Sequence, residues 1–141
     1  MSRYLGIDYG SKRCGIAISD PTKMIASAMN TVPSHELMNF LSGYFKKEAV
    51  EKVVIGKPMT LDNQPSQSFV LVERFVAAFK KRFPDIPIVW EDERYTSSMA
   101  VEAMIAGGMK KKDRREKGMI DRISAAILLQ SYLDRDKTES E

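Results

Sequence analysis

The strongest constraint on the fold of this chain is the alternation of short apolar segments with longer segments of helical periodicity. The apolar runs have strand length and end at glycine, proline or polar turn residues. The expected strands are residues 3–8, 13–19, a segment within 24–32, 52–56 and 86–90. The expected helices are one capped by Ser34 and reaching Phe45, one from about Phe69 that stops before Pro84, one capped by Thr96 or Ser97 and ended by Gly107, and residues 118–133.

The order of these elements predicts an α/β fold. The turn at residues 9–12 suits a hairpin, so the first three strands should form an antiparallel meander. After residue 34 the strands alternate with helices, which predicts parallel strands joined by right-handed crossovers. We therefore expect a mixed sheet, antiparallel in its first three strands and then parallel, with helices on both faces. Pro87 favours an outer position for strand 86–90.

The length and composition favour one cytoplasmic domain. The 141 residues suffice for a single core, which we assign to residues 1–134, with a charged and disordered tail at 135–141. No apolar run reaches the ~20 residues of a membrane span, and the first residues lack a signal-peptide pattern. A single cysteine, Cys14, excludes an intrachain disulfide and fits a reducing compartment.

Three acidic residues, Asp8, Glu93 and Asp121, lie far apart in the sequence within apolar or helical segments. The topology predicts Asp8 and Glu93 at or just beyond strand ends, where ligands gather in such sheets, and Asp121 on the inward stripe of the last helix. Three converging carboxylates would repel one another unless a cation compensates them. Mg²⁺ or Mn²⁺ is expected, because both prefer carboxylate oxygens, whereas one His and one Cys cannot supply the usual zinc ligands. Such a site suits phosphodiester chemistry.

Each of these acids also has a structural interpretation. Asp8 could close the first hairpin as an Asx-turn residue, and Asp121 could be a first-turn helix carboxylate near the surface. Glu93 belongs to the run Glu91–Asp92–Glu93, in which strand alternation puts Glu91 and Glu93 on one face. We choose Glu93 for the site because it is nearest the strand end. We expect Glu91 to be an exposed charge on the edge strand, with support of Glu93 as the alternative.

Basic residues near strand ends and before the last helix predict contacts with nucleic-acid phosphates. Residues 110–117 hold six basic side chains in eight positions, and glycines at 6 and 10 would leave room near Asp8 for a bulky anion. The alternatives are a solvated loop and plain surface charges. The candidate nucleic-acid contacts are Lys12, Lys57, Arg94, Lys110, Lys111, Lys112, Arg114 and Arg115, and Arg13 is a further basic residue of the first hairpin.

Four segments resemble the YqgF/RuvX family of small bacterial proteins with a ribonuclease H-like fold. They are GIDYGSKRCGIAISDP (6–21), VVIGKP (53–58), EDERYTS (91–97) and DRISAAILLQSYL (121–133). The resemblance implies a nuclease dependent on magnesium or manganese, with Asp8, Glu93 and Asp121 matching the family's acidic positions. It also implies a nucleic-acid substrate, either the 5′ end of precursor 16S ribosomal RNA or a four-way DNA junction. After VVIGKP this chain reads MTLDNQPSQS, unlike the P-L-N-M-D-G-type stretch more frequent in the family.

Several functions remain open at this point. Endonucleolytic maturation of precursor 16S ribosomal RNA is the first, and resolution of Holliday junctions, which calls for a two-fold dimer, is the second. A non-catalytic RNA-binding module for ribosome assembly is the third. We expect a nucleic-acid partner, no membrane partner, and a monomer or a homodimer. Residues 8–13 also resemble the phosphate loop of actin-type ATPases, but those proteins need a duplicated domain that 141 residues without a repeat do not supply.

Overall fold

The computed structural model describes residues 2–58, 68–92 and 118–140 of the chain, with side chains through Arg135. Five strands and three α-helices lie in these ranges, together with one short 3₁₀ helix. The strands are β1 (Arg3–Asp8), β2 (Arg13–Ser19), β3 (Ala26–Pro33), β4 (Val50–Lys57) and β5 (Ile88–Asp92). The helices are η1 (Ser34–Glu36), α1 (Leu37–Lys47), α2 (Phe69–Arg82) and α5 (Met119–Ser140).

The strands form one mixed sheet in the order β3-β2-β1-β4-β5. β1 pairs with β2, and β2 with β3, in antiparallel fashion, while β4 is parallel to both β1 and β5. The predicted meander, the parallel crossovers and the outer position of the last strand are therefore confirmed. Because β1, β4 and β5 are parallel, their last residues Asp8, Lys57 and Asp92 end at the same edge of the sheet.

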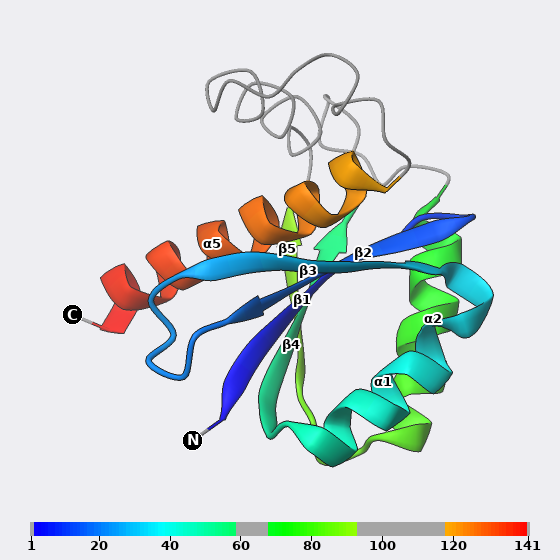
Figure 1. The fold of residues 1–141 in the computed structure, drawn as a ribbon, viewed down its shortest axis with the longest axis horizontal. Coiled ribbons are helices and arrows are strands. Elements are labelled where there is room, and N and C mark those ends of the chain that lie inside the picture. The colour runs from blue at the N-terminus through cyan, green and yellow to red at the C-terminus, as the bar shows by residue number, and fades with distance from the viewer. Residues whose placement is uncertain (1, 59–67, 93–117, 141) are drawn as a thin grey trace.

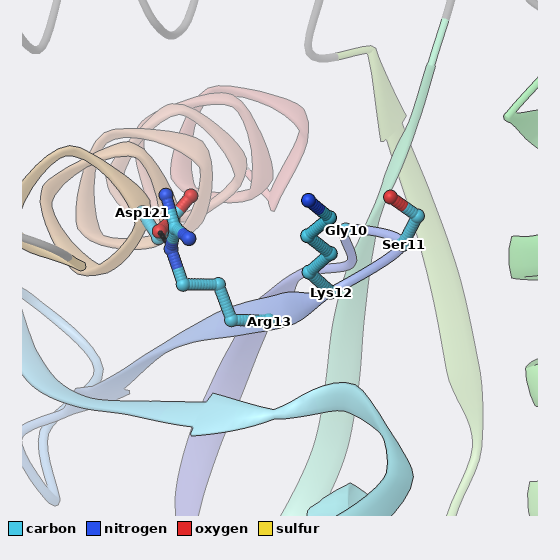
Figure 2. Close-up of a pocket in the computed structure, with 5 residues that line it drawn as sticks. All are labelled: Gly10, Ser11, Lys12, Arg13 and Asp121. Carbon is cyan, nitrogen blue, oxygen red and sulfur yellow. Dashed lines mark hydrogen bonds and ion pairs between the residues drawn. The ribbon is translucent and has the colours of Figure 1, made fainter.

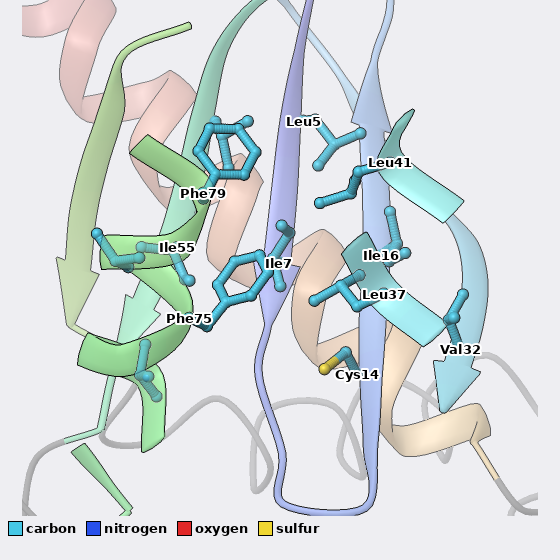
Figure 3. Packing of buried hydrophobic residues seen from close by; sticks show 13 residues of the cluster. Leu5, Ile7, Cys14, Ile16, Val32, Leu37, Leu41, Ile55, Phe75 and Phe79 are labelled. Atoms are coloured by element: carbon cyan, nitrogen blue, oxygen red, sulfur yellow. The ribbon is translucent and has the colours of Figure 1, made fainter. Parts of the chain in front are cut away.

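Helices cover both faces of the sheet, as expected: α1 and α2 lie on one face and α5 crosses the other (Figure 1). The larger core lies under α1 and α2, where alternate strand residues such as Leu5, Ile7 and Ile55 meet Leu41 and Phe79 (Figure 3). These five side chains are all fully buried. Burying a leucine, isoleucine or phenylalanine side chain contributes about 1.5–3 kcal/mol each, so this layer is a main source of stability.

The start of the first helix differs from its prediction. Ser34 does not cap α1; it begins η1, and the N-cap of α1 is Glu36, without a side-chain cap. The Ser34 hydroxyl instead donates a hydrogen bond of 2.6 Å to the carbonyl of Gly10 in the β1–β2 turn. A serine hydroxyl can cap a helix or donate a hydrogen bond to a nearby carbonyl, so the local sequence alone did not decide between these two partners.

α5 approaches the sheet closely because glycines leave space beneath it. A Cβ atom on Gly6 would lie 2.9 Å from the Cβ of Leu129, and one on Gly15 would overlap the carbonyl of Asp121. The space beside Gly6 is thus filled by α5, so the expectation that it would receive an anionic ligand is wrong. Ala125 is fully buried at the same contact, where its small side chain also permits the close approach.

α5 is longer than its sequence pattern indicates. It continues to Ser140, whereas the apolar periodicity ends at Leu133. The predicted end is wrong because adding residues to a helix that is already nucleated costs little, so a polar segment without apolar periodicity can continue it. Residues 135–140, assigned above to a disordered tail, belong to this helix. Among the helices of the described ranges, none combines the length and hydropathy needed to cross a membrane.

Substitution of Gly15 by alanine should destabilise the protein by about 3 kcal/mol, because a new Cβ would collide with the backbone of α5. Gly43 in α1 offers the matched control, since nothing lies within 4 Å of the position of its Cβ. Gly43→Ala should stabilise the protein by about 0.5–1 kcal/mol through better helix propensity. Urea unfolding measures both free energies. Equal effects of the two substitutions would contradict the close approach at Gly15.

Candidate active site

Asp8 is the last residue of β1, at the edge where the parallel strands end. Its neighbour Ile7 is fully buried in the core under α1 and α2. Because strand side chains alternate, Asp8 lies on the opposite face, the one that α5 covers. The side chain is partly exposed there. The strand pattern therefore places Asp8 on the α5 side of the sheet, at the strand end that the sequence predicted.

Asp121 lies in the first turn of α5, on the stripe that faces the sheet. Ala125, Leu128 and Tyr132 continue this stripe and are buried, which confirms the predicted orientation of the helix. The Asp121 side chain is 28% exposed, and its Oδ2 accepts a hydrogen bond of 2.7 Å from the Nε of Arg13. The helix N-terminus also favours a negative charge at this position.

Gly15 lies beside both Asp8 and Asp121. In the β1–β2 ladder Asp8 is the direct partner of Gly15, and the Cα atoms of such antiparallel partners lie about 4.5–5.5 Å apart. On the helix side, the Asp121 backbone occupies the space where a Gly15 side chain would be. Asp8 and Asp121 thus flank one glycine, although they are more than a hundred positions apart in the sequence.

The pKa of Cys14, the neighbour of Gly15, is affected by the negative charges of both Asp8 and Asp121. Its thiol is buried and lies 3.4 Å from the Ser34 hydroxyl. Burial is the main cause that raises the pKa of Cys14, and the charges of Asp8 and Asp121 raise it further against the hydrogen bonds with Ser34 and Gly10. The thiol is therefore protonated and shielded at neutral pH, in agreement with its interpretation as a small buried strand residue.

An open pocket of about 220 Å³ adjoins Asp121 and is lined by Gly10, Ser11, Lys12, Arg13 and Asp121. Figure 2 shows Arg13 reaching from β2 to the Asp121 carboxylate, while the Lys12 side chain rises beside it from the turn. Lys12 is exposed, so its ammonium is available to solvent or to an anion. The structure thus brings Lys12, a predicted nucleic-acid contact, next to Asp121.

The role of Arg13 was missed by the sequence analysis, which treated it as one more basic residue. Strand alternation carries the signal that could have found it. Arg13 and Gly15 are two positions apart on β2, so they face the same side of the sheet, and that side is covered by α5. The pattern therefore indicated the face of the sheet on which Arg13 lies. Only the tertiary structure shows that its partner there is Asp121.

Other predicted site residues lie elsewhere. Lys57 ends β4 at the same edge, but it lies two positions from Ile55 and therefore on the same face as that core residue, and its Nζ lies 5.4 Å from the centre of the Phe69 ring of α2. Its side chain therefore lies on the face opposite Asp121. The remaining predicted residues lie outside the described residues: Glu93, Arg94, Lys110, Lys111, Lys112, Arg114 and Arg115.

Glu91 was expected to be exposed, and this expectation is wrong. Its side chain is only 5% exposed, because α5 extends across β5 and covers it. The Ser131 hydroxyl donates a hydrogen bond of 2.9 Å to Oε2, and the Arg135 guanidinium lies 2.7 Å from Oε1 as an ion pair without hydrogen-bond geometry. Ser131 lies about 15 Å along α5 from Asp121. Glu91 is therefore an anchor for the second half of the helix.

The acidic side chains near Gly15 fit a hard divalent cation better than a soft one. Asp8 and Asp121 supply carboxylate oxygens, the ligands that Mg²⁺ and Mn²⁺ prefer. Within the described ranges, no three His, Cys, Asp or Glu residues form a group that could hold a metal ion, and the third predicted ligand, Glu93, lies outside them. Any cation at Asp121 would have to share its carboxylate with Arg13.

Comparison with known proteins identifies the relatives of the chain. A family model described as RuvX, Holliday junction resolvase, matches residues 2–135. A protein of Bacteroides thetaiotaomicron named "Putative pre-16S rRNA nuclease" is 50% identical over 134 residues, which cover 95% of this chain and 97% of that protein. The match spans Asp8 and Asp121 as well as every strand and helix described above except the last residues of α5.

Two solved structures share the fold. The Fowlpox virus resolvase, solved with Holliday junction DNA, has a TM-score of 0.59 at 14% identity, and the match covers 94% of this chain and 97% of that one. The Thermus thermophilus RuvC protein, also solved with a Holliday junction, has a TM-score of 0.55 at 16% identity, and the match covers 98% of both chains. The predicted ribonuclease H-like mixed sheet is confirmed.

Substitution of Glu91 by glutamine should lower the free energy of unfolding by about 1–3 kcal/mol, because a buried charge-assisted contact is lost while Arg135 keeps its charge. Glu73→Gln on the exposed surface of α2 is the control and should change stability by about 0.5 kcal/mol or less. Chemical unfolding of both variants tests this expectation. A neutral Glu91→Gln would contradict the anchoring role.

The pKa of Cys14 should fall when either nearby carboxylate is neutralised. Asp8→Asn and Asp121→Asn each remove a negative charge that raises this pKa, whereas Asp85→Asn, in the turn between α2 and β5, should leave it unchanged. The pH dependence of thiolate absorbance gives the value for each variant. If the first two variants match Asp85→Asn, Asp8 and Asp121 do not share the surroundings of Cys14.

Proposed function

This chain belongs to the RuvX family, and from that premise we propose that it is a divalent-metal-dependent endonuclease that acts in 5′-end maturation of precursor 16S ribosomal RNA. Membership of a nuclease family supports hydrolysis of phosphodiester bonds. The name of the Bacteroides relative, half identical in sequence over nearly its whole length, supports the ribosomal RNA substrate. A cytoplasmic location follows from this role in ribosome maturation.

The observation that carries the proposal is the convergence of Asp8 and Asp121 on Gly15. A residue at a strand end and a residue at a helix start, each with a carboxylate, lie next to the same glycine, and Asp121 also lines an open pocket. Arg13 compensates the charge of Asp121 in the ion pair, and the oxygen donors of the two acids would fit Mg²⁺ or Mn²⁺. When bound, such an ion supplies an activated water and stabilises the charge that develops on the phosphate oxygens.

The residues of the chain would divide the work as follows. Asp8 and Asp121 would hold the ion, with Glu93 as the third ligand because it directly follows Asp92, the residue that ends β5 at the Asp8 edge. Lys12, exposed in the same pocket, would attract and orient a phosphate of the substrate. Hydrogen bonds hold these segments in place: Ser34 of η1 donates to Gly10 of the β1–β2 turn, and Thr31 of β3 donates to Gly118 at the start of α5.

Holliday-junction resolution is the second candidate, because the family model that matches the chain is described as a Holliday junction resolvase. It requires two copies of the active site related by a two-fold axis, in order to nick two symmetric strands. Purified protein that is strictly monomeric while it cuts precursor RNA would rule it out. Cleavage of a four-way DNA junction by a dimer, with precursor RNA left intact, would favour it over the ribosomal role.

Asp8→Asn and Asp121→Asn should each lower cleavage of precursor 16S ribosomal RNA at least about 100-fold, because loss of a metal ligand removes several kcal/mol of transition-state stabilisation. Both variants should keep the fold, including Asp121→Asn, which removes the negative charge that pairs with Arg13. Cleavage is measured on the RNA and on a four-way DNA junction with Mg²⁺, Mn²⁺ or a chelator. The chelator should abolish wild-type cleavage.

Asp85→Asn is the matched control, since it makes the same chemical change at an exposed turn at the opposite end of β5. It should cleave at the wild-type rate. Wild-type activity of Asp8→Asn or Asp121→Asn would contradict the metal-dependent mechanism. Full complementation of a depleted strain by Asp121→Asn would instead support the non-catalytic assembly module.

A further inference from the structure

Arg13 lies between two neighbouring pockets. It lines the pocket that contains Asp121, and it also lines a second open pocket of about 460 Å³ together with Lys12, Thr31, Pro33 and Arg122. The two pockets share Lys12 and Arg13, so they adjoin each other at these residues. Because Arg13 lines both pockets, its long side chain has room on either side.

The second pocket has the composition of an anion site. The described residues that line it include three cations, Lys12, Arg13 and Arg122, and no acid. The Arg122 guanidinium lies 3.4 Å from the Thr31 hydroxyl, which in turn donates a 2.6 Å hydrogen bond to the Gly118 carbonyl at the start of α5. Hydroxyl and guanidinium groups on a fixed framework are typical of contacts with the phosphates of a nucleic acid.

In the first pocket, Arg13 and a bound metal ion would compete for the carboxylate of Asp121. Its Nε lies 2.7 Å from Oδ2 of Asp121, the carboxylate proposed above as a metal ligand. A divalent cation at this carboxylate and the guanidinium would repel each other and compete for the same oxygen. The ion pair is partly exposed, with 42% of the Arg13 side chain accessible, and pairs of this kind are worth only about 1 kcal/mol or less, so exchange of the partner is cheap.

We infer that Arg13 is a positioning residue that exchanges partners: it neutralises Asp121 in the metal-free protein and binds a substrate phosphate in the second pocket when Asp121 takes the metal. This inference rests on the proposed nuclease function and adds to it a change of partner by Arg13 that accompanies metal binding. Arginine suits the exchange, because its planar guanidinium matches both carboxylate and phosphate. By linkage, metal and nucleic acid then strengthen each other's binding through this one side chain.

Two binding measurements on Arg13→Gln test the exchange without any cleavage. In the absence of nucleic acid, calorimetry should find Mn²⁺ bound about two- to fivefold more tightly than by wild type, because the competing cation is gone. With Ca²⁺ at fixed concentration and a precursor 16S RNA fragment, binding should weaken. The slope of log K against log salt should become shallower by about 0.7–0.9, the loss of one phosphate contact. Gel analysis confirms that the RNA stays intact.

Three further variants separate the exchange from a general charge effect. Arg13→Lys keeps the charge and should retain the wild-type salt slope. Arg122→Gln should also make the salt slope shallower, but it should leave Mn²⁺ affinity unchanged, because the ion pair with Asp121 is made by Arg13 whereas Arg122 contacts Thr31. Lys81→Gln, on α2 at the opposite face of the sheet, removes one positive charge and should alter neither quantity. Thermal unfolding of every variant reports whether its fold is kept.

The outcomes distinguish this inference from the proposed function. If Arg13→Gln binds Mn²⁺ no more tightly than wild type and keeps its salt slope, Arg13 only holds α5 in place and the exchange is wrong, even if wild type cleaves RNA. If wild type cleaves neither RNA nor junction DNA with any metal, the proposed function fails instead.

A measurement on wild type remains decisive if Arg13→Gln does not fold. Nitrogen-15 spectra resolve the Nε–H of arginine, and Arg13→Lys identifies the Arg13 signal. Adding Mg²⁺ should shift this signal and speed its hydrogen exchange, because its hydrogen bond to Asp121 is lost. A signal that Mg²⁺ leaves unchanged would overturn the exchange.

Discussion

The close approach of α5 to the sheet is the constraint on which the site depends. Gly6 and Gly15 have no side chains, so the backbone of α5 lies directly against β1 and β2. This contact has a chemical consequence as well as a packing one. It brings the first turn of α5, with Asp121, next to the last residue of β1, Asp8. The same glycine that permits dense packing thereby brings two acidic residues from distant parts of the sequence next to each other.

The two faces of the sheet have different tasks. The face under α1 and α2 carries the larger apolar core, in which aromatic residues such as Phe75 and Phe79 pack against aliphatic strand residues. The face under α5 is narrower and more polar, with the Glu91–Arg135 ion pair at one end and the Arg13–Asp121 ion pair at the other. Charges can persist on this second face because each has a partner or access to water, and because the first face supplies the hydrophobic stabilisation.

The two ion pairs of α5 illustrate how burial decides the role of a charge. Glu91 is 5% exposed and its pair with Arg135 anchors the helix, since a partner lost from a buried carboxylate is costly. Asp121 is 28% exposed beside an open pocket, so its pair with Arg13 can exchange at low cost. A buried acid that is tied to the fold is unsuited to ligand exchange, whereas a partly open one is suited to it.

The sequence by itself determined the order of the strands and helices, the mixed sheet, and the faces on which Asp8 and Asp121 lie, because residue periodicity reports which side of an element is buried. It did not determine the partner of Ser34, the burial of Glu91, the end of α5 or the pairing of Arg13 with Asp121. Each of these depends on which distant segment comes to lie alongside, and local propensity carries no information about that. Only the tertiary structure, through the passage of α5 over Gly15, decided that Asp121 meets Arg13 and lies beside Asp8.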